Sequence, residues 1–338
     1  MSTTKKESSA RIEYIDFLKC IGLISIIIAH VNSPRWLMGV RSFDVPFMVI
    51  LSSILCARSY RKYLNNRISS LQFYADRVKR LVIPTWIFLC LYFTLAFVFI
   101  GKSYDVPFYL LSFSLTRYGI GYVWIILIYL YSALLIPLYS KIKLSYRSIL
   151  CIVTIYLLYE LSYYFRIGTE NKFIDTTFYY IIPYGVLTFL GYHYHKIKNS
   201  YKVMLILTSF TLFIGCGIYY WNEYGSFRLV SIAKYPPRIY YLAYGIAISF
   251  ILLMICEKWS CKLYSNTVVR FISKNSLWIY LWHILVLDVY NFLPLPDIWY
   301  IKLMIVSITA GSIVFVVNKT IDLIETKFSF PLLKYLKG

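Results

Sequence analysis

The chain alternates between long apolar stretches and short polar segments. Ten of the apolar stretches come close to the length of about 20 residues that a helix needs to cross a bilayer. This pattern predicts an all-α, polytopic membrane protein, with about ten transmembrane helices in one bundle and short loops between them. The stretches cover residues 14–31, 43–60, 81–100, 121–140, 148–165, 176–194, 203–221, 239–256, 276–293 and 300–317.

Shorter signals refine this picture. The apolar stretch at 107–115 is too short to span a bilayer, so we expect it to lie at the membrane interface. Pro84, Pro137 and Pro183 fall within the long stretches, where proline ends or kinks a helix. Tyrosine and tryptophan gather at the ends of the stretches, which is typical of the aromatic belts of membrane proteins.

Composition excludes a soluble protein. Of the 338 residues, 59% are hydrophobic and 15% are charged, whereas soluble chains average about 45–50% and about 25%. A soluble chain of this length with so few polar side chains could not cover its surface. Disordered, collagen-like and coiled-coil chains are excluded by the same composition, which includes only 14 Gly and 11 Pro beside 35 Tyr and 23 Phe.

The chain carries a formal charge of +20. Nucleic acid is not expected as a partner, because the aromatic residues lie in apolar stretches and not among the basic residues. The basic loops are instead expected to contact anionic membrane lipid. Most of the seven cysteines lie in apolar stretches, and none forms a metal-ligand spacing with histidine. We therefore expect no metal site and no disulfide framework.

Lys and Arg are distributed unevenly between alternate loops. The N-terminal segment, the even-numbered loops and the C-terminus hold 24 of them, and the odd-numbered loops hold 10. Because loops rich in Lys and Arg stay in the cytoplasm, we expect both termini there. The predicted organisation is a cytoplasmic segment at 1–13, a transmembrane domain at 14–320 and a cytoplasmic tail at 321–338.

Three ionisable residues interrupt the first apolar stretch. Inserting each of them into the membrane costs at least about 2.5 kcal/mol of free energy. Asp16 and Lys19 lie near its cytoplasmic end and His30 near the other end. Eleven helical residues place Lys19 and His30 on one face, roughly 16 Å apart. Two interpretations stay open. Either Asp16 and Lys19 extend to the interface while His30 caps the helix end, or His30 is a general base in a polar cavity, because imidazole titrates at about pH 6.5.

A second cluster, FYADRVKRLVIP, places Arg77, Lys79 and Arg80 at the cytoplasmic start of the third stretch. Arg77 and Arg80 share a helix face at this spacing. Guanidinium groups in such a pair suit a phosphate-rich ligand arriving from the cytoplasm. Anchoring of the helix by positive charge explains the same residues equally well.

Further ionisable residues lie in later stretches. His283 and Asp288 fall within 276–293, and Glu160 is alone in the fifth stretch. His283 is either a second cavity group or a hydrogen-bonding group between helices, and Glu160 is either a transport group or a structural one. His193 and His195 lie at a cytoplasmic boundary, where we expect both at the interface.

Five motifs, in this order along nearly the whole chain, resemble segments of the acyltransferase-3 family of membrane acyltransferases. The first has a basic residue, ten residues and then histidine, although Lys19 stands where the family commonly has arginine. The third contains Arg-x-x-Arg, and the fifth matches Ser-Leu-x-Ile-Tyr-Leu-x-His. The motifs are RIEYIDFLKCIGLISIIIAH, VPFMVILSSIL, FYADRVKRLVIP, GYVWIILIYLY and SLWIYLWHILV.

The resemblance implies a ten-helix enzyme of the bacterial cell membrane that moves acyl groups, usually acetyl from acetyl-CoA, to a surface glycan or a lipid-linked glycan. It implies that His30 is the catalytic histidine, grouped with Asp16 and Lys19. The donor would be held by Arg77, Lys79, Arg80 and Lys19, and the substrate cavity would include Trp124, Tyr280 and His283.

This hypothesis requires a passage through the bundle from the two guanidinium groups to His30, because CoA is cytoplasmic and the acceptor is outside. Two other functions stay open. A transporter or flippase for a glycan or lipid-linked precursor would explain Glu160, His283 and Asp288. A non-catalytic membrane subunit of an envelope complex would use the same helices as assembly surfaces.

Overall fold

The structure, a computed structural model, describes residues 13–259, 261–327 and 333–337. Regular structure within these ranges consists of helices, without strands, which confirms the predicted all-α class. Most of the predicted N-terminal segment, 1–13, lies outside the described residues. In the predicted tail, 321–338, the last long helix continues to Glu325, so it ends eight residues later than the apolar stretch indicated.

Each of the ten apolar stretches lies mostly on one long helix, although residues 29–31 follow α1 and residues 121–123 precede α6. Seven segments among the described residues are long and apolar enough to cross a membrane, so the protein is a membrane protein; α1, α7 and α12 are outside that set. The long helices are α1 (Glu13–Ile28), α3 (Asp44–Asn65), α4 (Ser70–Ile100), α6 (Trp124–Lys141), α7 (Tyr146–Tyr164), α8 (Lys172–His193), α9 (Asn199–Tyr224), α10 (Ile239–Lys258), α12 (Ser276–Phe292) and α13 (Trp299–Glu325).

The described residues also contain four short α-helices and four 3-10 helices. The short α-helices are α2 (Arg35–Val40), α5 (Val106–Phe113), α11 (Thr267–Lys274) and α14 (Leu333–Leu336), and the 3-10 helices are η1 (Arg41–Phe43), η2 (Tyr194–Lys196), η3 (Val230–Ala233) and η4 (Lys262–Ser265). Helix α5 covers most of the short apolar stretch. Pro84, Pro137 and Pro183 lie inside α4, α6 and α8, so none of them ends a helix.

Side-chain caps set where several helices begin. The Ser69 hydroxyl accepts from the backbone N–H of Gln72 at the start of α4, and the Asn171 side chain accepts from two backbone N–H groups at the start of α8. Helix α4 ends where Gly101 adopts a left-handed φ of 66°. Such caps satisfy backbone groups that the helix leaves unpaired.

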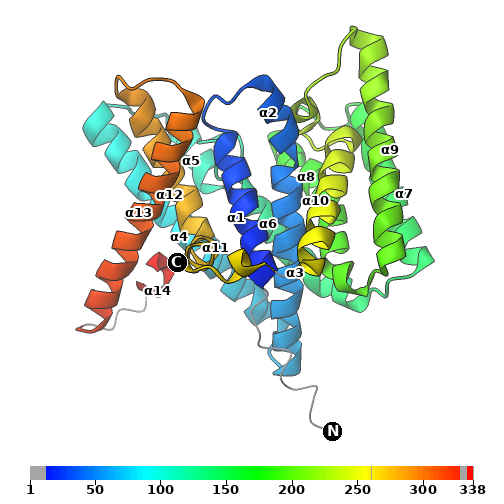
Figure 1. Ribbon diagram of the computed structural model, residues 1–338, viewed down its shortest axis with the longest axis horizontal. Coiled ribbons are helices and arrows are strands. Elements are labelled where there is room, and N and C mark those ends of the chain that lie inside the picture. Colours follow the sequence, from blue (N-terminus) through cyan, green and yellow to red (C-terminus); the bar gives the residue numbers. More distant parts are fainter. Residues whose placement is uncertain (1–12, 260, 328–332, 338) are drawn as a thin grey trace.

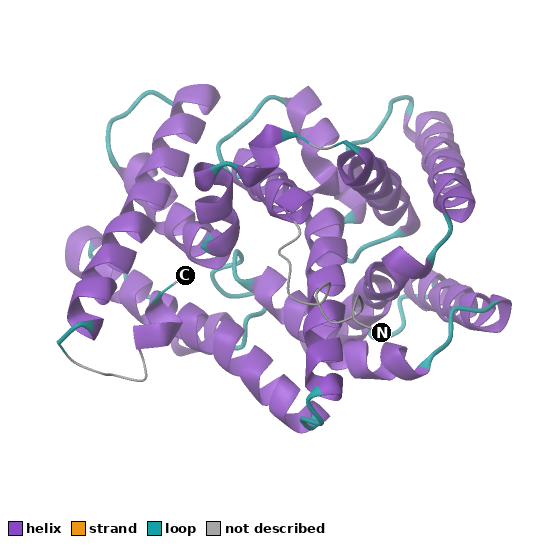
Figure 2. Ribbon diagram, turned by 60° about the horizontal axis from the view of Figure 1, so that its bottom comes forward, coloured by secondary structure: helices purple, strands orange, loops and turns teal. Residues whose placement is uncertain are grey.

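The long helices run alternately up and down, so that α1 begins and α13 ends at the same end of the bundle (Figure 1). We call this the lower end, and the opposite one, where α1 ends and α2 lies, the upper end. Helix α3 is central and packs against α1, α6, α8 and α10. Helices α9 and α13 lie at opposite sides of the molecule, as the tilted view also shows (Figure 2).

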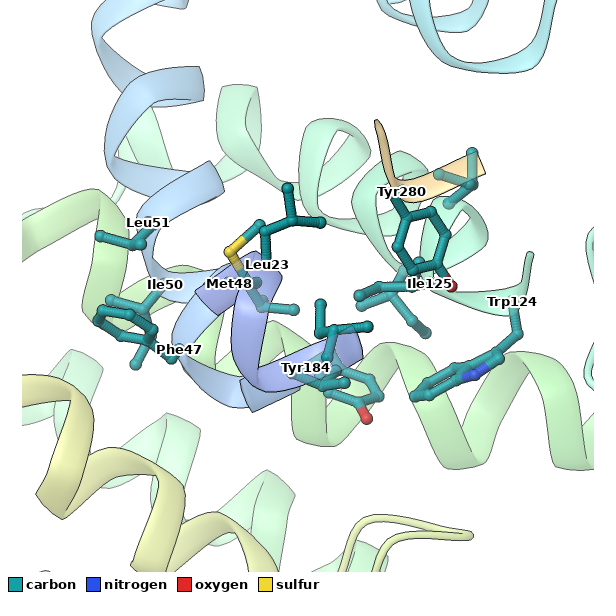
Figure 3. Packing of buried hydrophobic residues seen from close by; sticks show 14 of the residues in the cluster. Leu23, Phe47, Met48, Ile50, Leu51, Trp124, Ile125, Tyr184 and Tyr280 are labelled. Atoms are coloured by element: carbon teal, nitrogen blue, oxygen red, sulfur yellow. The ribbon is translucent and has the colours of Figure 1, made fainter. Parts of the chain in front are cut away.

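The core where α1, α3, α6 and α12 meet positions the site. Leu23, Met48, Ile125 and Tyr280 come from these four helices (Figure 3). A Cβ atom on Gly22 would lie 2.4 Å from the Met48 sulfur, so glycine at this position allows α1 and α3 to approach closely.

Candidate active site

A cavity of about 380 Å³ lies among α1, α3, α4, α6, α11 and α12. Apolar side chains form most of its wall, but seven polar side chains also face it. They are Lys19, Ser52, Ser59, Arg77, Arg80, Lys274 and Ser276. Of the three ionisable residues in the first apolar stretch, Lys19 lines this cavity, whereas Asp16 and His30 are not among its lining residues.

The charged groups of this cavity are all cations. Lys19, Arg77, Arg80 and Lys274 line it, and none of the described carboxylates does. The Arg77 guanidinium also lies 5.2 Å from the centroid of the Phe73 ring, which holds it beside an aromatic face. A cavity with this charge favours a polyanionic ligand.

Lys79 lies outside this cavity, in a neighbouring hollow of about 360 Å³. The hollow shares Arg80 and Lys274 with the cavity and adds Asp76 and Lys337. The three residues that the Arg-x-x-Arg segment predicted as one group are therefore divided over two adjacent spaces, with Arg80 common to both.

Asp16 and Lys19 are joined through α11. Lys19 Nζ donates to the carbonyl oxygen of Ser273, and the Ser273 hydroxyl donates to Asp16 Oδ1 at 2.5 Å. Asp16 lies near the start of α1, roughly 20 Å along the helix axis from His30. The geometry places Asp16 where it can position Lys19 and not where it can touch His30.

His30 lies just beyond α1, in the turn that follows Ile28. Its Nδ1 atom is 3.0 Å from Nε2 of His283, which is fully buried on α12. The two ring planes differ by 13° and the ring centroids are 5.2 Å apart. The rings therefore meet edge to edge, in the geometry of an N–H···N hydrogen bond.

When both rings are neutral, a second hydrogen bond of His283 determines which ring nitrogens carry the protons. Nδ1 of His283 bonds to the carbonyl oxygen of Tyr280, which can only accept. His283 must then carry its proton on Nδ1, which leaves Nε2 as an acceptor. His30 must donate from Nδ1, so the lone pair of His30 is on Nε2. This tautomer leaves His30 Nε2 able to take a proton from another group.

Tyr280 separates the cavity from the two histidines. Its side chain lines the cavity, and its ring centroid is 5.0 Å from that of His283. Its hydroxyl donates to the carbonyl oxygen of Tyr122, whose ring lies 4.9 Å from His30. The cavity therefore extends from the arginines to Tyr280, and neither His30 nor His283 is among its lining residues.

Trp124 is not among the lining residues of this cavity. It is 7% exposed, and its ring packs against Tyr180, Tyr184 and Tyr235 with centroids 5.2–6.2 Å apart. It begins α6, two residues after Tyr122, whose ring contacts His30, and so lies at the same end of the bundle as His30.

The family model for the acyltransferase domain of the acyltransferase-3 family matches residues 12–317, nearly the whole chain. The chain belongs to the acyltransferase-3 family. Neither the curated proteins nor the solved structures contain a match to it. Family membership and the apolar helices together make this protein a membrane acyltransferase.

The structure of this acyltransferase also identifies residues that the sequence analysis missed. Lys274 lines both the cavity and the neighbouring hollow, and Tyr122 contacts His30. Lys274 stands two residues before the Ser-Leu-x-Ile-Tyr segment, so a search for cations beside the motifs would have found it. Tyr122 is one of 35 tyrosines, and nothing local distinguishes it.

The acids that suggested transport have partners within the bundle. Glu160 Oε2 pairs with Nε of Arg238 at 2.5 Å, and Oε1 accepts from the Ile239 backbone N–H at 2.8 Å. Asp288 accepts from the Tyr92 hydroxyl at 2.5 Å. These contacts give Glu160 a structural role at the start of α10.

The two histidines of the GYHYHKIK segment differ from each other. His193 is fully buried against the rings of Phe189 and Tyr192. It is therefore enclosed by protein, whereas the sequence predicted a position at the membrane interface. His195 is 38% exposed and lies 3.8 Å from Glu257. Neither lies in the cavity.

Proposed function

We propose that this acyltransferase moves an acetyl group from cytoplasmic acetyl-CoA to a hydroxyl of a surface polysaccharide or its lipid-linked precursor in a bacterial cell membrane. All ten long helices would span the membrane, with both termini in the cytoplasm. The observation that carries the proposal is the cation-lined cavity that leads from Arg77 and Arg80 to Tyr280, beside the paired imidazoles.

The donor fits the lower end by charge and shape. The phosphates of CoA would meet Arg77 and Arg80, together with Lys79 and Lys274 in the adjoining hollow. The slim pantetheine arm would enter the apolar part of the cavity and pass Lys19. Roughly 16 Å of helix separates Lys19 from His30, a span that this arm can cover. A small movement of the Tyr280 side chain would then bring the thioester to the histidines.

In the reaction, His30 Nε2 takes the proton from the acceptor hydroxyl as the oxygen attacks the thioester carbonyl. The tetrahedral intermediate expels the CoA sulfur when the C–S bond breaks, and the new C–O ester bond remains. The proton on His30 passes to the leaving thiolate, so the imidazole returns to its neutral form. His283 keeps its ring oriented by the Tyr280 carbonyl and accepts the hydrogen bond from His30 Nδ1 throughout.

The test uses purified protein in proteoliposomes with radiolabelled acetyl-CoA on the inside and host surface glycan on the outside. His30→Ala should lower transfer to the glycan by about 10²- to 10⁴-fold. The matched control is His195→Ala, which removes a partly exposed histidine outside the cavity. Undiminished transfer by His30→Ala would remove His30 from the mechanism.

A further inference from the structure

A second pocket, of about 330 Å³, lies at the upper end between α7, α9 and the segment 225–238 that leads into α10. We propose that this upper pocket binds an acidic sugar unit of the acceptor, at a distance from the unit that is acylated. The inference rests on the proposed function. The pocket is lined by Tyr163, Tyr220, Tyr224, Arg228, Ile232, Ala233, Tyr235, Pro236 and Arg238.

The upper pocket is positively charged. Its lining includes Arg228 and Arg238 but no carboxylate from the part of the chain that the structure describes. Glu160 neutralises only Arg238, and its Oε1 atom is also occupied by the Tyr156 hydroxyl at 2.6 Å. Among the described residues, no carboxylate forms an ion pair with Arg228, whose guanidinium lies 4.5 Å from the Tyr224 ring centroid. Arg228 is therefore available to an anionic ligand.

The remaining lining favours a sugar over a lipid. Four of the nine lining residues are tyrosines, which offer a flat apolar face for a sugar ring and a hydroxyl for hydrogen bonding. The Tyr220 and Tyr224 rings are nearly parallel, 26° apart, with centroids separated by 6.0 Å. The aliphatic lining is limited to Ile232, Ala233 and Pro236, which is too little surface for an acyl chain.

The segment that forms the pocket is held in place by hydrogen bonds. Tyr240 donates its hydroxyl hydrogen to the Arg228 carbonyl at 3.0 Å, and Tyr159 donates to the Pro237 carbonyl at 2.8 Å. The Arg238 backbone N–H donates to the Ala233 carbonyl at 2.8 Å. A pocket fixed in this way loses little freedom when a ligand binds.

An aromatic path connects the upper pocket with His30. The Tyr235 ring, which lines the pocket, lies 5.2 Å from that of Trp124, and Lys234 Nζ lies 5.6 Å from the Trp124 ring. Trp124 is two residues from Tyr122, which contacts His30. A glycan with one unit in the pocket could therefore extend over Trp124 to the histidines.

The experiment measures binding to the full-length protein in phosphatidylcholine nanodiscs. The probes are a tetrasaccharide containing glucuronate and the neutral tetrasaccharide of N-acetylglucosamine. Arg228→Ala should weaken binding of the acidic probe about tenfold and leave the neutral probe unchanged. The matched control is Arg35→Ala, which removes an exposed arginine of α2 at the same end and should alter neither affinity. Tyr224→Ala should weaken the binding of both probes, whereas Tyr224→Phe should leave it unchanged.

Several results would overturn the inference. Equal affinities of Arg228→Ala and the unaltered protein for the acidic probe would exclude Arg228 as its partner. Loss of acidic-probe binding in phosphatidylglycerol nanodiscs would identify the pocket as a lipid headgroup site. The proposed reaction is tested separately, because His30→Ala should bind both probes normally while its acetyl transfer falls by about 10²- to 10⁴-fold. Binding of CoA by Arg228→Ala, unchanged from that of the unaltered protein, would show that the variant is folded.

Discussion

At the scale of single residues, the central feature is a pair of imidazoles that come from opposite ends of the chain. His30 donates to His283, and His283 donates to a backbone carbonyl, so one ring orients the other. The arrangement assigns different roles to the two histidines. In the proposed reaction, His30 uses its free nitrogen and His283 acts as a positioning residue.

His283→Ala should therefore lower the rate constant of transfer, by less than His30→Ala, and leave the KM for acetyl-CoA nearly unchanged. His283→Gln should keep part of the activity, because its side-chain oxygen can accept the hydrogen bond from His30 Nδ1. Steady-state rates at several donor concentrations separate kcat from KM. If His283→Gln and His283→Ala were equally impaired, orientation through this hydrogen bond would not be the role of His283.

At the scale of helices, close approach at glycines sets the positions of the cavity walls. A Cβ atom on Gly191 of α8 would lie 2.7 Å from the Ile50 carbonyl oxygen and 2.7 Å from Cβ of Ser53, both on α3. Backbone atoms cannot move aside as a flexible side chain can. Since α3 carries Met48, Leu51 and Ser52 on the cavity wall, the spacing of α3 and α8 affects the site.

Gly191→Ala should destabilise the protein by about 1–3 kcal/mol, because α3 and α8 must separate. The matched control is Gly311→Ala on α13, where an added Cβ meets nothing within 4 Å. That change should be neutral or stabilising by up to about 1 kcal/mol, since alanine favours the helix. Thermal unfolding of both variants in the same detergent compares them. Equal unfolding temperatures of Gly191→Ala and Gly311→Ala would show that the α3–α8 contact tolerates the extra methyl group.

Arg77 and Arg80 of α4 line the cavity and are the residues proposed to bind the donor phosphates. Arg77→Ala combined with Arg80→Ala should raise the KM for acetyl-CoA at least about tenfold, because charge-assisted hydrogen bonds to its phosphates are lost. The control pair is Lys143→Ala with Arg147→Ala, which removes two exposed cations from the lower end without touching the cavity. Similar KM values for the two double variants would mean that the arginines act only as membrane anchors.

At the scale of the whole molecule, the alternating helices separate two chemical environments. Cations lie around the lower part of the cavity, and tyrosines and arginines form the pocket at the upper end. The paired histidines lie between the two, with Tyr280 on the cavity side and Tyr122 on the other. This arrangement suits a reaction whose two substrates arrive from opposite sides of a membrane.

The proposed orientation can be tested with a native cysteine. Cys261 is exposed in the loop between α10 and α11, at the lower end. With Cys90 and Cys151 replaced by alanine, a maleimide that does not cross membranes should label Cys261 only after the cells are broken. A cysteine introduced by Ser226→Cys, at the upper end, should react in intact cells. The opposite pattern of labelling would place the termini outside the cytoplasm.

The sequence by itself determined the helices and the chemistry of the lower end. Lipid leaves no partner for unpaired backbone groups, so long apolar stretches must be helical. Cations within or beside such stretches are costly enough to stand out, which is how Lys19, Arg77 and Arg80 were found.

Only the tertiary structure decided which groups meet. His30 and His283 are 253 positions apart, and their contact depends on how α12 is rotated and how far α1 extends. The same packing places Asp16 against Ser273, buries His193, removes Trp124 from the cavity lining and adds Lys274 to it. Hydrophobic periodicity specifies which face of a helix is buried, but the neighbour on that face is selected by side-chain packing across the whole bundle.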